Sequence, residues 1–70
     1  MNTKLATLLG AKIKYYRGLQ NMEQQQLAAH IGLSVQYLSK IERGRQMPSL
    51  HVLCLIADCL AIEPYLLLKP

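Results

Sequence analysis

Apolar side chains recur along this chain every three or four residues, the period of an α-helix with one buried face. Positions 5, 9, 13 and 16 form the first such stripe, and three lysines lie off it, which predicts a helix over residues 3–20. Gly10 lies inside this helix, where a glycine costs about 1 kcal/mol relative to alanine. Either another backbone packs closely there or the glycine is incidental. Asn21 suits a left-handed cap after the last turn.

Two short helices are predicted next, separated by very few residues. The first begins near Glu23 and ends before Gly32, which permits a sharp turn at positive φ. The second begins after Ser34, a favourable N-cap, and ends near Gly44. The inward positions of the two helices are Leu27, Ala28, Ile31, Val35, Leu38, Ile41 and Glu42.

A fourth helix is predicted to open at Pro48-Ser49, and Pro64 is predicted to start a short final helical segment over residues 65–68. The buried side of the fourth helix is predicted to carry Leu50, Leu53, Ile56 or Ala57, and Leu60. The sequence shows neither a strand-like alternation nor a linker. It therefore predicts one all-α domain over residues 1–70, a compact bundle of five helices.

The composition makes this domain small and basic. A domain of 70 residues buries only about 60% of the surface of its unfolded chain. Since the chain has no tryptophan or phenylalanine, its core must come from aliphatic side chains and four tyrosines. The net charge is +4 and the pI is about 9.3, which favours a polyanionic partner and leaves nucleic acid and anionic membrane open.

The two cysteines are not expected to form a disulfide. Cys54 and Cys59 lie five residues apart in one predicted helix, so their side chains diverge by about 140°. They are expected to be small core residues of a cytoplasmic protein. His51 and Cys54 supply at most half of a metal site, and no second pair of ligands follows, so no metal or cofactor is expected. The apolar run over residues 5–11 is too short to be a secretory signal.

Residues 24–43 have the spacing of a helix-turn-helix unit. A small residue at Ala28 lets two helices cross closely, and Gly32 makes the turn between them. Through QQQLAAHIGLSVQYLSKIERGRQMPSL and the flanking helices, the chain resembles the Cro/C-repressor (XRE-like) helix-turn-helix DNA-binding domains, from about residue 5 to residue 68. The resemblance implies a fold of the lambda-repressor-like type and makes double-stranded DNA the expected partner in place of a membrane.

The resemblance also implies roles for four residues near the ends of the helices. In this family an arginine late in the first helix commonly pairs with a glutamate at the end of the third, and Arg17 and Glu42 stand at these places. Glu42 is on the inward side, where it would be costly unless paired. Gln24 stands where the family often has a glutamine that touches the DNA backbone. Glu23 departs from the usual Ser or Thr cap and would repel a nearby phosphate.

The outward face of the third predicted helix carries the side chains expected to read DNA. Gln36, Lys40 and Arg43 lie opposite the apolar stripe and are long enough to reach base edges in the major groove. On an unrelated helix the same residues would be an ordinary solvated face. The base-reading candidates are Val35, Gln36, Tyr37, Lys40 and Arg43, and the phosphate-contacting candidates are Gln24, Ser34, Ser39, Arg45 and Gln46.

The sequence favours a binding protein over an enzyme. It contains no phosphate-binding loop, no usefully spaced pair of carboxylates and no nucleophile with a plausible base. The leading hypothesis is a sequence-specific transcriptional regulator, a repressor that binds a two-fold operator as a homodimer. The alternatives are an antitoxin-like protein-interaction module and a small controller that activates a restriction-modification gene, with a toxin or polymerase as protein partner. The residues expected to form the dimer surface are Tyr65, Leu66, Leu67 and Leu68, some of which must still pack inward.

Overall fold

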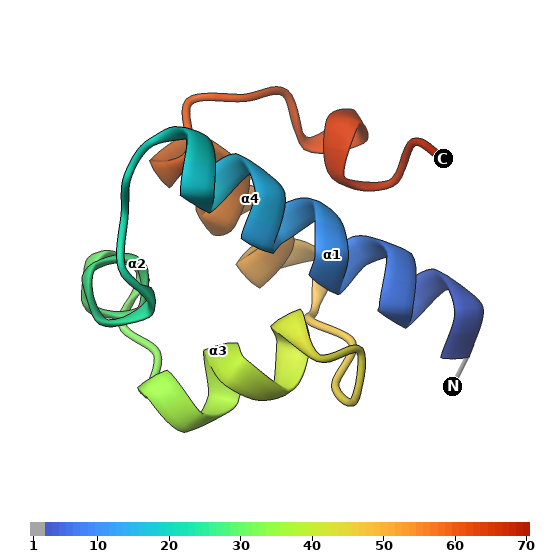
Figure 1. The fold of residues 1–70 in the computed structure, drawn as a ribbon, viewed down its shortest axis with the longest axis horizontal. Coiled ribbons are helices and arrows are strands. Elements are labelled where there is room, and N and C mark those ends of the chain that lie inside the picture. The colour runs from blue at the N-terminus through green and yellow to red at the C-terminus, as the bar shows by residue number, and fades with distance from the viewer. Residues whose placement is uncertain (1–2) are drawn as a thin grey trace.

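The computed structural model, which describes residues 3–70, is entirely helical (Figure 1). Its elements are α1 (Thr3–Leu19), α2 (Gln24–Ile31), α3 (Val35–Glu42), α4 (Leu50–Cys59) and the 3-10 helix η1 (Pro64–Leu67). Figure 1 shows α1 crossing the middle of the molecule, with α3 on one side of it and η1 on the other. The all-α prediction is confirmed.

The predicted count of five helices is not confirmed. Residues 3–70 form four α-helices, and the fifth segment is only a turn of 3-10 helix. Pro64 starts it, and it closes through i→i+3 bonds from the Leu66 N–H to the Glu63 carbonyl and from the Leu68 N–H to the Tyr65 carbonyl, both at 3.0 Å. A segment of four residues is too short to build a regular i→i+4 ladder of its own.

The helix ends follow from local residue chemistry, as the sequence predicts. Asn21 and Gly32 both adopt left-handed backbone conformations, with φ of 53° and 73°, and end α1 and α2. Ser34 caps α3 by accepting a hydrogen bond from the Tyr37 N–H at 3.1 Å. Ser49 caps α4 in the same way, from the Val52 N–H at 3.1 Å. The Ser34 cap sets where α3 begins.

The core is built from aliphatic side chains of all four α-helices and η1. Its buried members are Leu9, Ile13, Leu27, Ala28, Leu38, Ile41, Leu53, Ile56, Ala57, Leu60 and Leu67. Leu50, predicted to be buried, is 74% exposed. It is the first residue of α4. Val52 is the first residue of this helix that packs against the core, and Leu53 is the first that is buried in it.

Gly10 lies where α1 crosses the carboxyl end of α3. A Cβ atom added to Gly10 would stand 2.6 Å from the Glu42 carbonyl oxygen and closer still to that of Ile41. Gly44, at φ 75°, approaches α1 as closely, because a Cβ there would stand 2.8 Å from the Thr7 Cα. The backbone of α1 is therefore in direct contact with the end of α3, and this contact accounts for the glycine inside α1.

Candidate nucleic-acid interface

The α3 helix has one face in the core and one in solvent. Leu38, Ile41 and Glu42 are buried, whereas Gln36, Lys40 and Arg43 are exposed. The polar sector expected from the sequence is therefore on the surface of the protein. The backbone behind this sector is fixed on two sides, by the contact with α1 at Gly10 and by the packing of α3 against α2.

The remaining candidates surround this sector. Val35, Tyr37 and Ser39 are half-buried at its edges, and the Ser34 hydroxyl is used as the α3 cap. Arg45 is exposed in the loop after α3. The other polar candidate in this loop is half-buried and donates from Gln46 Nε2 to the Met47 carbonyl oxygen at 3.1 Å. The loop thus adds an exposed guanidinium and a tethered amide beside α3.

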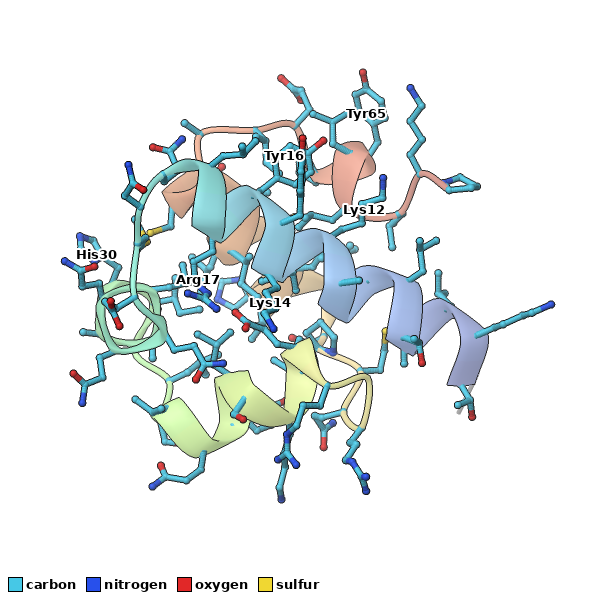
Figure 2. The ribbon with its side chains drawn as sticks, viewed as in Figure 1. Lys12, Lys14, Tyr16, Arg17, His30 and Tyr65 are labelled. Carbon is cyan, nitrogen blue, oxygen red and sulfur yellow. The ribbon has the colours of Figure 1, made fainter. Side chains whose placement is uncertain are left out.

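The predicted Arg17–Glu42 pair is present and ties α1 to α3. Arg17 donates from Nε to Glu42 Oε2 at 2.7 Å and from Nη2 to Glu42 Oε1 at 2.9 Å. Its Nη1 donates to the Met22 carbonyl oxygen at 2.7 Å. Figure 2 shows the Arg17 side chain reaching from α1 toward the space between α2 and α3. The Glu42 side chain is only 3% exposed and that of Arg17 15%, so the pair is largely desolvated.

Electrostatics at this pair favour the charged guanidinium. The hydrogen bond to Glu42 raises the pKa of Arg17 and outweighs the opposing effect of burial, and the charge of Glu42 adds to the increase. The carboxylate satisfied in this way no longer carries the cost of an isolated buried charge, which explains how an acid can stand on the inward side of α3.

Gln24 joins the same cluster, a contact that the sequence does not predict. It is the first residue of α2, and its Nε2 donates to Glu42 Oε1 at 2.9 Å. The helical periodicity of one segment cannot indicate this contact, because the contact depends on how closely the N-terminal end of α2 approaches the C-terminal end of α3. Side chains from α1 and α2 therefore both donate hydrogen bonds to the carboxylate that α3 carries.

The C-terminal candidates separate into exposed and buried residues. Tyr65 is 62% and Leu68 42% exposed, and Leu66 is half-buried. The prediction that Leu67 lies on the dimer surface is wrong, because this side chain is fully buried and packs in the core between α1 and α4. In the view of Figure 2, Tyr65 lies on the opposite side of α1 from α3. The apolar surface of η1 is thus smaller than the sequence suggests.

The cysteines and the possible metal ligands among residues 3–70 form no second site. Cys54 and Cys59 are free and half-buried, and burial raises the pKa of the Cys59 thiol. Across residues 3–70, no three or more His, Cys, Asp or Glu side chains gather in an arrangement that fits a metal ion. No helix in the same range has the length and apolar character needed to cross a membrane.

A helix-turn-helix family model matches residues 13–67, which include α2, α3 and the buried ion pair. The chain belongs to the Cro/C1-type helix-turn-helix family. It is 40% identical over 52 residues to an uncharacterized HTH-type transcriptional regulator of Methanocaldococcus jannaschii, covering 74% of this chain and 79% of that protein. It is 45% identical over 55 residues to the ImmF control region 10 kDa protein of Bacillus phage phi105, covering 79% of this chain and 61% of the phage protein.

Solved structures of this helix-turn-helix family share the fold. The restriction-modification controller protein C.AhdI from Aeromonas hydrophila superposes with a TM-score of 0.85 at 31% identity, covering 89% of this chain and 94% of that chain. The clp gene regulator ClgR from Corynebacterium glutamicum gives a TM-score of 0.89 at 30% identity, covering 91% of this chain and 68% of that chain. Because these superpositions cover 89% and 91% of the chain, the similarity extends beyond the helix-turn-helix unit.

Proposed function

We propose that this helix-turn-helix protein is a transcriptional regulator that binds double-stranded DNA sequence-specifically, with α3 in the major groove. The observation that carries the proposal is the exposed sector of Gln36, Lys40 and Arg43 on a helix whose opposite face buries Leu38, Ile41 and Glu42. A major groove admits an α-helix, and side chains of this length reach its base edges. The net charge of +4 favours the approach to phosphate.

The proposed division of labour follows the position of each side chain. Gln36, near the start of α3, makes paired hydrogen bonds to adenine, and Lys40 reads guanine. Arg43 is shared between base and phosphate, and the half-buried Val35 and Tyr37 contact a thymine methyl or a sugar. The proposed phosphate contacts come from Gln24, Ser34, Ser39, Arg45 and Gln46.

The proposed regulator acts as a homodimer on a two-fold operator in the cytoplasm. Two copies related by a two-fold axis present two α3 helices to successive major grooves, which matches a palindromic site. The exposed apolar side chains Tyr65 and Leu68, with the half-buried Leu66, are the surface proposed to join the copies. Repression by covering a promoter requires no activity beyond DNA binding.

A second candidate is activation by a small controller protein. It is favoured by the likeness to a restriction-modification controller protein, of which the chain covers 94%. Both candidates need the same DNA-reading face and differ only in where the operator lies relative to the promoter. An antitoxin-like protein-interaction module would instead show no salt-dependent DNA binding.

Selection of bound duplexes from a random pool, followed by anisotropy titrations at two salt concentrations, tests the proposal. Gln36→Ala should cost about 1–3 kcal/mol on the preferred duplex and relax the preference at one base pair. Arg45→Ala should weaken binding to all sequences alike and reduce the salt slope by about one unit. Gln25→Ala, an exposed glutamine of α2 outside the proposed interface, is the matched control and should change neither quantity.

The DNA-reading role of α3 is refuted if Gln36→Ala and Lys40→Ala both leave the affinity and the preferred sequence unchanged while the protein stays folded. The homodimer is tested separately by sedimentation. A monomer at high micromolar concentration, both free and on DNA, contradicts it. Tyr65→Ser should weaken the dimer, because this side chain is 62% exposed in the single chain. The thermal midpoint should stay at its wild-type value at concentrations where both proteins are monomeric and fall below it where the wild type is a dimer.

A further inference from the structure

The side-chain amide of Gln24 is hydrogen-bonded to the Glu42 carboxylate, which is buried and paired with Arg17. Its Nε2 donates to Glu42 Oε1 at 2.9 Å, the oxygen that also accepts from Arg17 Nη2 at 2.9 Å. Hydrogen bonds to an ionised acceptor are roughly twice as strong as neutral ones. The bond therefore holds the amide in one of its two flip states, with the nitrogen and not the oxygen against Glu42.

Only one further donor remains on this side chain. A glutamine amide carries two N–H donors and one carbonyl acceptor, and Glu42 uses one donor. Within residues 3–70, the second N–H and the carbonyl oxygen of Gln24 have no hydrogen-bond partner, and the side chain is half-buried. Since a phosphate oxygen accepts but does not donate, the second N–H is the one group of this amide that can bind it.

The ion pair with Arg17 also reduces the repulsion that the Glu42 carboxylate would exert on a DNA phosphate. A lone carboxylate one hydrogen bond away from a DNA phosphate would repel it. The two hydrogen bonds from Arg17 offset the charge of Glu42, so the carboxylate can orient Gln24 without opposing the approach of the backbone.

We propose that Glu42 is a positioning residue for DNA: it holds the Gln24 amide so that its second N–H is presented to a backbone phosphate at the start of α2. This inference rests on the proposed DNA-binding function. The inference gives the buried Arg17–Glu42 pair a role in DNA affinity in addition to its role in stabilising the fold. A neutral or absent partner at position 42 would let the amide flip and rotate, and the contact would lose its preorganisation.

A double-mutant cycle on duplex binding tests the coupling. The wild type, Gln24→Ala, Glu42→Gln and the double variant are titrated against the preferred duplex and a scrambled one, with each Kd corrected for the folded fraction from thermal melts. Gln24→Ala should weaken both duplexes about tenfold. Glu42→Gln should weaken binding similarly in the wild-type background and much less in the Gln24→Ala background.

The ratio of affinities for the two duplexes separates positioning from a displaced α3. If Glu42 acts through Gln24, the ratio stays at its wild-type value in Glu42→Gln, because a phosphate contact carries no sequence information. As a control, Gln36→Ala combined with Glu42→Gln should be additive. Additive effects of Gln24→Ala and Glu42→Gln, or a collapsed ratio in Glu42→Gln, would overturn the inference.

A measurement on the unmodified protein avoids any failure of a variant to fold. In ¹⁵N-labelled wild type without DNA, one Gln24 side-chain amide proton should exchange slowly with solvent and the other should exchange rapidly. After duplex is added, the second proton should also exchange slowly. Exchange of both as fast as the exposed Gln25 amide would overturn the inference. Failure of the wild type to bind any duplex would overturn the DNA-binding proposal as well, whereas binding with additive variants would overturn the positioning role alone.

Discussion

Replacing Gly10 by alanine should destabilise the protein, whereas the same replacement at Gly18, in the same helix, should stabilise it. The two sites differ in what a Cβ atom would meet. At Gly18 no atom lies within 4 Å, whereas at Gly10 the Glu42 carbonyl oxygen and carbon lie 2.6 and 2.8 Å away. Backbone atoms cannot rotate aside as a flexible side chain can, so Gly10→Ala must push α1 and α3 apart.

The magnitudes follow from two opposing terms. Alanine is better than glycine inside a helix by about 1 kcal/mol, and this gain is common to both variants. Overpacking a well-packed site costs about 1–3 kcal/mol or more, and contact with backbone on both helices places Gly10→Ala at the upper end. The expected net change is a loss of about 2 kcal/mol for Gly10→Ala and a gain of about 0.5–1 kcal/mol for Gly18→Ala.

Thermal and urea unfolding followed by circular dichroism measure this difference. For a domain of this size 1 kcal/mol shifts the midpoint by about 4–8 °C, so Gly10→Ala should melt about 10 °C lower than the wild type and Gly18→Ala a few degrees higher. Gly10→Ala should also bind DNA less tightly at temperatures where it is folded, because α3 has moved. Equal midpoints for the two variants would refute the close approach of α1 to α3.

Three other predictions concern single sites. Ala61→Gly should raise the free energy of unfolding by about 0.5–1 kcal/mol in urea titrations, because Ala61 has φ 58° at the end of α4; an unchanged or lowered value would contradict this. Glu42→Ala should lower it by about 3–5 kcal/mol by leaving Arg17 unpaired, and an unchanged thermal midpoint would rule out the buried pair. Cys59 should be alkylated more slowly at pH 8 in the folded protein than in urea, because burial raises its pKa and reduces the thiolate; equal rates would contradict this.

The elements of this fold are predictable because their signals are local. Ser34, Ser49, Asn21 and Gly32 act through contacts within a few residues, and each has the role in the structure that its chemistry predicts. The inward position of Glu42 is also local, since it follows from the helical period of α3. Its partner Arg17 comes from the family resemblance and not from periodicity.

The two wrong predictions of burial, and the contact that the sequence does not predict, depend on distances between elements. Leu50 and Leu67 are both apolar residues in helical segments, yet one is 74% exposed and the other fully buried. Only the place where α4 and η1 meet the core decides between them. The contact between Gln24 and Glu42 requires the N-terminal end of α2 and the C-terminal end of α3 to approach within hydrogen-bond distance. Residue patterns do not carry such distances.

The fixed position of α3 explains how a domain with so small a core can hold the proposed DNA-reading face in place. Its inner side packs on α2, its last carbonyls meet Gly10, and its terminal carboxylate is held by Arg17. A helix held in this way loses little further freedom when it enters a groove, so less of the binding free energy is offset by ordering. The residues that fix α3 are buried, whereas Gln36, Lys40 and Arg43 are exposed. Exchange of these three side chains should therefore change the DNA sequence that is preferred while leaving the fold intact, whereas exchange of Gly10 or Glu42 should lower the stability of the fold.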